Sequence, residues 1–327
     1  MRDAIVVGSS AGGVRALRGL LHGLPKDLAA SVVVVNHIPA RGTSDLPLLL
    51  ASAGPLAAKA VEDGEALKHG AIYVAPADRH VVIENGRLRL TRGPRENRVR
   101  PCIDTLFRSA AVDLGPRVIG VVLSGTLDDG TAGLWAVKDR GGVAMVQQPS
   151  EAEYPDMPES AIEHVRVDHV LPVADMGAKL AALAGEPTPQ AVPPPPAMAA
   201  ETQIDLHGRA LDKGVLDLGR PSPNTCPACH GALVEIREGN LARYRCHTGH
   251  AFSLRTLLEE TEVAIERSLW NTVRVIEERS FLLRSMERQA RDKGNHELGG
   301  RLAAAAERDE THAQGVREMT VKPAGAR

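Results

Sequence analysis

The hydrophobic positions between residue 1 and about residue 185 alternate between short continuous runs and runs with helical spacing. Ala4 to Val7 and Ser31 to Asn36 predict buried strands, and Val14 to Leu21 predicts a helix. The same alternation predicts strands at 71–75, 80–84, 87–90, 118–123 and 143–146, and helices at 44–52, 103–114, 131–139, 159–164 and 174–184. Strands that alternate with helices are typical of an α/β protein with a doubly wound, mainly parallel sheet covered on both faces. We therefore place a first domain at residues 1–185.

The pattern changes three times after residue 185. Prolines concentrate between residues 185 and 200, which predicts an extended, semi-rigid linker, and we place the linker at 186–223, although 201–223 has no interpretable pattern. Residues 224–252 contain three of the four cysteines and two stretches of strand-like alternation, 233–236 and 241–245, which predict a small ribbon.

Residues 253–327 form a helical extension in this interpretation. Ser253 is a candidate N-cap, and a break at Gly294-Asn295 separates a long helix from a second one that runs from His296 to about Gln314. An apolar stripe on the long helix predicts a packing seam between the two helices or with a second subunit; its members are Leu258, Ile265, Leu269, Val273, Ile276 and Leu283. A docking face for a receptor or a kinase is the alternative for this stripe.

Composition narrows the class of protein. The 327 residues, 43% of them hydrophobic, are enough for a full core and two folding units, and a net charge of −2 with 2% aromatic residues argues against a nucleic-acid partner. No apolar run reaches the roughly 18 residues that a membrane span needs, and Met1-Arg2-Asp3 leads directly into a strand rather than a signal peptide. Four cysteines, three of them clustered, are typical of a metal site in a reducing compartment. We expect a cytoplasmic protein without membrane insertion.

The strongest candidate for chemistry is the turn after the first strand. Ser10 lies within Gly8-x-Ser10-x-Gly12, the spacing of a nucleophile elbow, where small neighbours allow a sharp turn that exposes the hydroxyl. The start of the following helix also directs N–H groups toward this hydroxyl, which suits an oxyanion. A tight structural turn is the alternative, whereas a dinucleotide site is disfavoured because G-x-G-x-x-G is not met.

Two further polar groups follow predicted strands. His37 comes directly after the second strand, and Asp128-Asp129 follow the strand at 118–123. Ligands of such folds bind beyond the carboxyl ends of the strands, so we expect a Ser-His-Asp triad there, in which an imidazole activates the hydroxyl and a carboxylate orients the imidazole. Individually, His37 could be a strand-end cap and either aspartate a helix N-cap.

Six blocks in residues 3–184 carry a specific resemblance. They are Gly8-x-Ser10-x-Gly12-Gly13, Asn36-His37-Ile38-Pro39, Ile72-Tyr73-Val74-Ala75-Pro76, Arg100 to Phe107, Leu123-Ser124-Gly125 with Asp129 to Gly133, and Tyr154 to Pro158. Together they resemble the catalytic domain of CheB-type protein-glutamate methylesterases. The resemblance implies a cytoplasmic enzyme of chemotaxis-type phosphorelay signalling that hydrolyses glutamate γ-methyl esters on chemoreceptors and, in many members, deamidates receptor glutamines.

The resemblance also implies roles for individual residues. Ser10 matches the nucleophile, His37 the base and Asp129 the orienting acid, with no cofactor for catalysis. The backbone N–H groups of Ala11, Gly12 and Gly13, with the region of Thr126, are the expected oxyanion donors. The chain departs from the family pattern at Ala11, usually threonine, and at Thr126-Leu127-Asp128, usually Met-Gly-Asn.

Regulation and partners are expectations of the same kind. The family usually has a receiver domain before the catalytic domain, but here the first strand starts at residue 4, so we expect a stand-alone form that is constitutive or controlled by its C-terminal half. The expected partners are methyl-accepting chemoreceptors, with a histidine kinase or methyltransferase of the same pathway. The alternative function is a non-catalytic receptor-binding adaptor, which the departures at Ala11 and Thr126-Leu127-Asp128 support.

The clustered cysteines predict a structural zinc site. Cys226-Pro-Ala-Cys229 supplies one ligand pair, and Cys246 with a following histidine supplies the second. Either His247 or His250 could be the fourth ligand, and we favour His250 because adjacent Cys246 and His247 would strain the chelate. Four protein ligands leave no open position, so the metal would be structural rather than catalytic. Free structural cysteines are the alternative.

Overall fold

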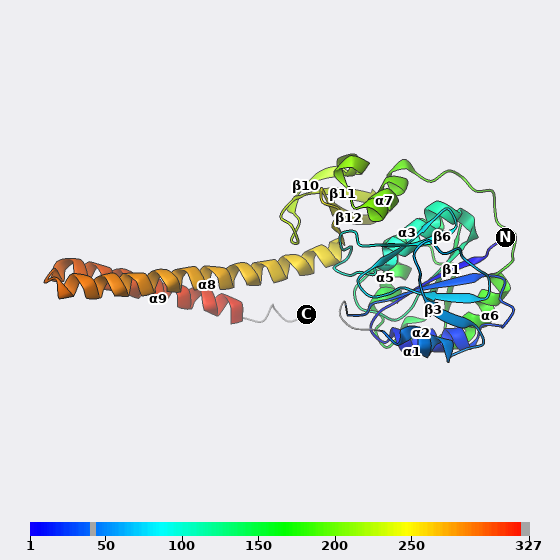
Figure 1. Ribbon diagram of the computed structural model, residues 1–327, viewed down its shortest axis with the longest axis horizontal. Helices are drawn as coiled ribbons and strands as arrows, with labels where there is room; N and C mark the ends of the chain where they lie inside the picture. The colour runs from blue at the N-terminus through cyan, green and yellow to red at the C-terminus, as the bar shows by residue number, and fades with distance from the viewer. Residues whose placement is uncertain (40–43, 322–327) are drawn as a thin grey trace. The chain divides into compact units, whose positions relative to one another are not determined.

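Seven parallel strands form the main sheet, in the order β3-β4-β2-β1-β7-β8-β9 (Figure 1). The computed structural model describes residues 1–39 and 44–321. The chain divides into two units, Met1–Leu257 and Leu258–Arg327, and the sheet belongs to the first. Its strands are β1 (Ala4–Ser9), β2 (Ser31–Asn36), β3 (Ala57–Ala60), β4 (Ala71–Val74), β7 (Val118–Val122), β8 (Val143–Gln147) and β9 (His169–Leu171). The predicted doubly wound parallel sheet is confirmed.

Helices cover both faces of this sheet. One core contains side chains of α1 (Gly13–His22), α2 (Leu46–Ala51) and α6 (Val173–Leu183), and the other contains those of α3 (Ile103–Leu114), α4 (Thr131–Asp139) and α5 (Asp156–His164). Alternate residues of β2 enter different cores: Val32 and Val34 enter the first, Val33 and Val35 the second. Burial on both faces explains why the central strands are continuous apolar runs rather than alternating ones.

Two strands of the sheet have no apolar run and were not predicted. β3 and β9 are short strands at the two edges of the sheet, and their residues are exposed or half-buried. Conversely, β5 (His80–Glu84) and β6 (Arg87–Thr91) pair only with each other, as an antiparallel hairpin whose turn residues Asn85 and Gly86 have φ 51° and 68°. Positive φ at both positions is typical of the two-residue turn that Asn-Gly predicts.

A helix lies in the segment predicted to be a linker. Residues 187–195 have no regular structure, but α7 (Pro196–His207) follows, and two short 3₁₀ turns occur at 211–213 and 215–217. Two further 3₁₀ turns, at 115–117 and 149–151, lie in the parallel-sheet region. Pro196 occupies the first helical position, where its missing N–H costs nothing. The extended conformation expected through residue 200 is therefore wrong, because Met198 and Ile204 are buried and stabilise a helix that proline content alone disfavours.

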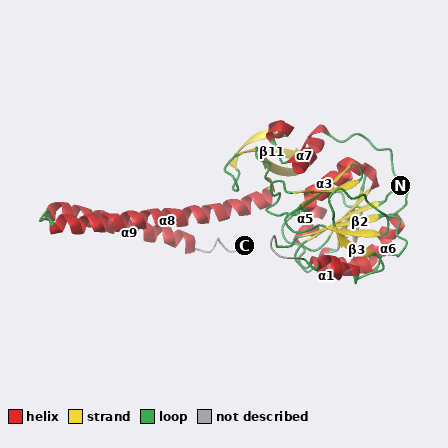
Figure 2. Cartoon of the chain, viewed as in Figure 1, coloured by secondary structure: helices red, strands yellow, loops and turns green. Residues whose placement is uncertain are grey.

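Four antiparallel strands form the ribbon (Figure 2): β10 (Arg220–Thr225), β11 (Ala232–Glu238), β12 (Leu241–Cys246) and β13 (Ala251–Ser253). The alternation at 233–236 and 241–245 corresponds to β11 and β12. Its small core contains Leu233, Tyr244 and Phe252 beside the cysteines. The ribbon lies within the unit that contains the parallel sheet rather than forming a separate one.

A buried cluster of charges joins the ribbon to the parallel-sheet region. Three guanidinium groups meet three carboxylates, and all six residues are nearly inaccessible to solvent: Arg108, Arg243, Arg245, Glu96, Glu201 and Asp205. Arg245 of β12 contacts Glu96 at 2.9 Å and Asp205 of α7 at 3.0 Å, and Arg108 of α3 contacts the same two carboxylates at 2.6 and 2.7 Å. Balanced pairing with hydrogen bonds is the condition under which buried charges are tolerated.

The second unit contains the helical hairpin, formed by α8 (Leu254–Asp292), which begins in the first unit, and α9 (His296–Val321). Val273, Ser280 and Ala290 of α8 are buried, as are Ala306, Asp309 and Ala313 of α9. Of the predicted stripe, Val273 is buried and Leu269, Ile276 and Leu283 are half-buried, whereas Leu258 and Ile265 are exposed. Packing of the stripe against a second subunit stays a prediction. Among the described residues, no helix is long and apolar enough to cross a membrane.

Candidate active site

Strand register brings Ser10 and His37 together. β1 and β2 are parallel neighbours in which Ser9 pairs with Asn36, so Ser10 and His37 are the next residues of adjacent strand ends. Ser10 Oγ lies 3.0 Å from His37 Nδ1. Ser10 is half-buried and the His37 side chain is 16% exposed, so both groups can be reached from solvent.

Asp129 approaches the other side of the imidazole. It follows β7, the second neighbour of β1, and its Oδ2 lies 2.8 Å from His37 Nε2. A carboxylate accepts, so we assign the proton to Nε2, which leaves Nδ1 as the acceptor for the Ser10 hydroxyl. The three side chains thus form a hydroxyl–imidazole–carboxylate chain.

The surroundings keep Asp129 ionised. The side chain is buried, which by itself would raise its pKa, but hydrogen bonds from His37, the Ile103 N–H and Asn97 lower the pKa to about 2. Ile103 N–H and Asp104 N–H belong to the first turn of α3, and donate at 2.8 and 3.2 Å. A helix N-terminus stabilises a negative charge, so α3 supports the carboxylate that orients His37.

Three residues of this site were missed by the sequence analysis. Asn97 Nδ2 donates to Asp129 at 2.9 Å and to Asp104 at 2.8 Å, and Cys102 Sγ lies 3.1 Å from Asp129. Burial, together with the nearby Asp129, raises the pKa of Asp104 well above its ordinary value. Cys102 and Asp104 lie in the block from Arg100 to Phe107 that carries the resemblance, whereas the only signal for Asn97 was its position shortly before the helix at 103–114. Although Cys102, Asp104 and Asp129 lie close enough to share an ion, every carboxylate oxygen already accepts a hydrogen bond, so we assign no metal here.

The turn after β1 provides two candidate oxyanion donors rather than three. Gly13 N–H donates to the Ser10 carbonyl at 2.9 Å, so its predicted role as a donor is wrong. Gly13 instead leaves space, because a Cβ there would lie 2.6 Å from Ser9 Cβ. Gly12 has φ 70°, which favours glycine. The N–H groups of Ala11 and Gly12 have no acceptor among the described residues and are available to a ligand.

The loop at 124–129 forms the other wall of the site. Ser10 N–H donates to the Ser124 carbonyl at 2.9 Å, and Thr126, two residues further, is exposed. Leu127 has φ 66°, a conformation that favours the glycine usual in the resembled family. Asp128 Oδ1 accepts from Ser253 Oγ at 2.8 Å, and burial raises the pKa of Asp128 to about 6. A role for Thr126 in oxyanion binding stays a prediction.

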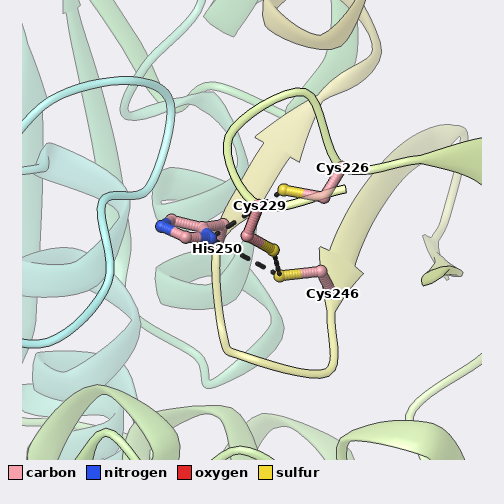
Figure 3. Close-up of side chains that lie close together, drawn as sticks. All are labelled: Cys226, Cys229, Cys246 and His250. Atoms are coloured by element: carbon pink, nitrogen blue, oxygen red, sulfur yellow. Dashed lines mark hydrogen bonds between the residues drawn. The ribbon is translucent and has the colours of Figure 1, made fainter. Parts of the chain in front are cut away.

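The ribbon brings together four candidate metal ligands: Cys226, Cys229, Cys246 and His250 (Figure 3). Cys229 Sγ lies 3.7 Å from Cys246 Sγ, and His250 Nδ1 lies 3.6 Å from Cys246 Sγ and 3.8 Å from Cys226 Sγ. Tetrahedral zinc requires about 3.8 Å between two sulfurs and about 3.6 Å between sulfur and nitrogen. The three distances are close to these values, and the four ligand atoms all lie within 4.8 Å of one another, so the residues fit a zinc ion. His247 is not one of the four residues in this group.

Comparisons with known proteins identify the family of the parallel-sheet region. Residues 5–180 match the protein family described as CheB methylesterase. A relative from Leptospira interrogans is 41% identical over 170 residues, which is 52% of this chain and 88% of that protein. A protein from Anaeromyxobacter dehalogenans is 38% identical over 53% of this chain and 51% of its own length. A protein from Thermotoga maritima is 37% identical over 54% of this chain and 52% of its own length. Both are named protein-glutamate methylesterase/protein-glutamine glutaminase. The crystal structure of the Thermotoga maritima CheB methylesterase catalytic domain is similar at a TM-score of 0.54 and 36% identity, covering 56% of this chain and 99% of that one.

Proposed function

This chain belongs to the CheB methylesterase family, and we propose that it hydrolyses glutamate γ-methyl esters on methyl-accepting chemoreceptors, with Ser10, His37 and Asp129 as its catalytic residues. The observation that supports this most is the pair of contacts at 3.0 and 2.8 Å that links the hydroxyl to the carboxylate through one imidazole. Deamidation of receptor glutamines uses the same groups and belongs to the same proposal.

The mechanism follows from these contacts. Ser10 Oγ attacks the ester carbonyl carbon while His37 Nδ1 takes the hydroxyl proton, and Asp129 stabilises the imidazolium that forms. The N–H groups of Ala11 and Gly12 hold the oxyanion. His37 returns the proton to the methoxy oxygen, the C–O bond breaks and methanol leaves. Water, deprotonated by His37, then attacks the glutamyl ester on Ser10 and releases the glutamate carboxylate and the serine.

Methanol release tests the proposed function. Full-length protein mixed with a receptor cytoplasmic domain methylated on glutamate should release methanol, and glutamine-containing receptor should release ammonia if the chain also deamidates. The adaptor alternative gives the opposite result, in which the protein binds the receptor and neither product forms. Binding without either product would overturn the proposal.

We also propose that Cys226, Cys229, Cys246 and His250 hold a structural zinc ion. The ligand spacing fits tetrahedral coordination, and four protein ligands leave no position for a substrate. None of the described cysteines forms a disulfide, which suits a reducing compartment, so the cytoplasm is the location that we propose. A histidine kinase or methyltransferase of the same pathway remains the proposed further partner.

Metal analysis should find one zinc ion per chain, and Cys246→Ser should abolish that binding because three ligands cannot complete the site. The matched control is Cys102→Ser, which changes a buried cysteine outside the ribbon and should keep the zinc. Elemental analysis after dialysis measures both. Zinc content unaffected by Cys246→Ser would contradict the assignment.

A further inference from the structure

The loop before α3 is held by the end of the ribbon. Asn97 N–H donates to the Ala251 carbonyl at 2.8 Å, and Ala251 N–H donates to the Arg95 carbonyl at 3.3 Å, so β13 pairs with this loop as a short parallel bridge. Glu96, between the two, enters the buried charge cluster through Arg108 and Arg245. Backbone and side chain together therefore fix this loop to the ribbon.

The Asn97 side chain connects the ribbon to the triad. Its Oδ1 accepts from Ser253 N–H at 2.9 Å and from Thr256 Oγ1 at 3.3 Å, and its Nδ2 donates to Asp129 Oδ1 and Asp104 Oδ2. Asn97 is 5% exposed, and the donors and acceptors of its side-chain amide are all used. Only one orientation of the amide satisfies these partners, since Nδ2 must face the carboxylates and Oδ1 the N–H and O–H donors.

The backbone of Asn97 is also unusual. Asn97 and Arg98 have φ 49° and 70°, a left-handed conformation that asparagine tolerates better than most residues but that still costs free energy. Residues retained in this conformation require support from their surroundings. Here the support comes from the end of the ribbon and the first turn of α8, because the partners of the Asn97 N–H and Oδ1 are Ala251, Ser253 and Thr256.

The geometry has a consequence for Asp129. One oxygen, Oδ2, faces His37, and the other, Oδ1, is held by Asn97, Cys102 and two backbone N–H groups. Asn97 also separates Asp129 from Asp104, since it donates one proton to each carboxylate. Without the amide, two buried carboxyl groups would face each other and Asp129 would lose a donor that orients it.

We propose that Asn97 is a positioning residue for Asp129. We also propose that the metal-loaded ribbon activates the triad by holding the side-chain oxygen of Asn97, Oδ1. This inference rests on the proposed esterase function. The connection to the metal is direct: β13 begins one residue after His250, and Cys246 N–H donates to the His250 carbonyl at 2.9 Å. A ligand set that fixes His250 also fixes the strand that holds Asn97.

Asn97→Ala tests the positioning role. Loss of a hydrogen bond to a charged group should lower kcat by about 10- to 100-fold with little change in KM, because substrate contacts stay intact. The acid limb of the kcat/KM profile should move to higher pH, since an Asp129 carboxylate that has lost the Asn97 donor favours the protonated form of the coupled imidazole–carboxylate pair more strongly. The control is Asn85→Ala, which removes an exposed asparagine that also has positive φ and should leave both quantities unchanged. Wild-type kcat and pH profile in Asn97→Ala would overturn the proposal, as would a fall in kcat without a shift of the profile.

Removal of the metal tests the coupling. Zinc should be chelated from full-length wild type and full-length Asn97→Ala, and kcat measured before and after, with zinc added back to show reversal. If the ribbon acts through Asn97, chelation lowers kcat of the wild type by about tenfold or more and kcat of the variant by less than about twofold, because the two changes remove the same interaction. Equal losses in both proteins would overturn the proposal.

A measurement without catalysis separates this inference from the esterase proposal. Amide hydrogen exchange at residues 95–99 should become faster when zinc is removed from the full chain, while exchange in β1 and β2 stays slow. If no methanol is released but this change occurs, the esterase proposal fails and the mechanical coupling stands. If methanol is released but exchange at 95–99 is insensitive to zinc, the coupling fails and the esterase proposal stands.

Discussion

Replacement of Ser10 with alanine should lower kcat for methanol release by about three to six powers of ten, with KM little changed. The hydroxyl lies 3.0 Å from His37 Nδ1, and no other described hydroxyl is hydrogen-bonded to that imidazole. The variant keeps the oxyanion donors and the receptor surface, so a small residual rate is expected. Single-turnover release from methylated receptor measures the change.

A serine outside the site provides the control for that experiment. Ser52 is exposed at the end of α2 and donates to the Leu49 carbonyl, so Ser52→Ala should retain the wild-type rate. Ser10→Ala should also keep the wild-type melting temperature to within a few degrees, which excludes unfolding as the cause of the loss. A Ser10→Ala protein that hydrolyses methyl esters at the wild-type rate would refute the triad.

The second large effect concerns stability. Arg245→Leu should destabilise the first unit by about 3–5 kcal/mol, because it leaves the buried carboxylates of Glu96 and Asp205 short of one partner. For a unit of this size the melting temperature should fall by roughly 6 to 20 °C. Thermal denaturation followed by circular dichroism measures the change, and the expected transition includes both the ribbon and the parallel sheet.

Arg237→Leu is the matched control, since Arg237 is exposed on the same ribbon and pairs with Glu235 at the surface. It should change the free energy of unfolding by no more than about 1 kcal/mol. Equal effects of the two variants would show that the buried cluster contributes no more to stability than a surface ion pair.

Acid provides an independent measure of the cluster's contribution to stability. Burial alone would raise the pKa of Glu201, but Arg243, Arg108 and Arg245 lower it to about 2 from an ordinary value of 4.5. This stabilisation is complete above about pH 4.5 and is lost as the pH falls toward 2.

The ribbon and the parallel sheet belong to one compact unit, so the ribbon is not an appended module. The sequence analysis placed a linker between the two regions and named control by the C-terminal half as one expectation. The buried charges and the Asn97 amide are the contacts through which such control would act. They connect residues 96–108 with residues 243–256, more than 100 positions apart along the chain.

The sequence by itself determined the parallel sheet, its two covered faces and the three residues of the candidate triad. Burial of β1, β2 and β7 on both faces requires continuous apolar runs, and the carboxyl ends of parallel strands meet at one edge, so Ser10, His37 and the pair Asp128-Asp129 could be placed together from local patterns. The family resemblance then selected Asp129. The four candidate metal ligands of the ribbon could also be found, with His247 as the alternative to His250, because chelation by nearby residues imposes fixed spacing along the chain.

Only the tertiary structure decided which groups support those residues. Edge strands β3 and β9 depend on neighbours rather than on apolar runs, and α7 is helical because Met198 and Ile204 are buried. Gly13 was excluded as an oxyanion donor by a backbone hydrogen bond that no pattern encodes. Asn97 contacts Asp129, Ser253 and Thr256 through polar bonds across long separations, and such bonds leave no periodic signal in a sequence because their partners are chosen by the fold and not by neighbouring residues.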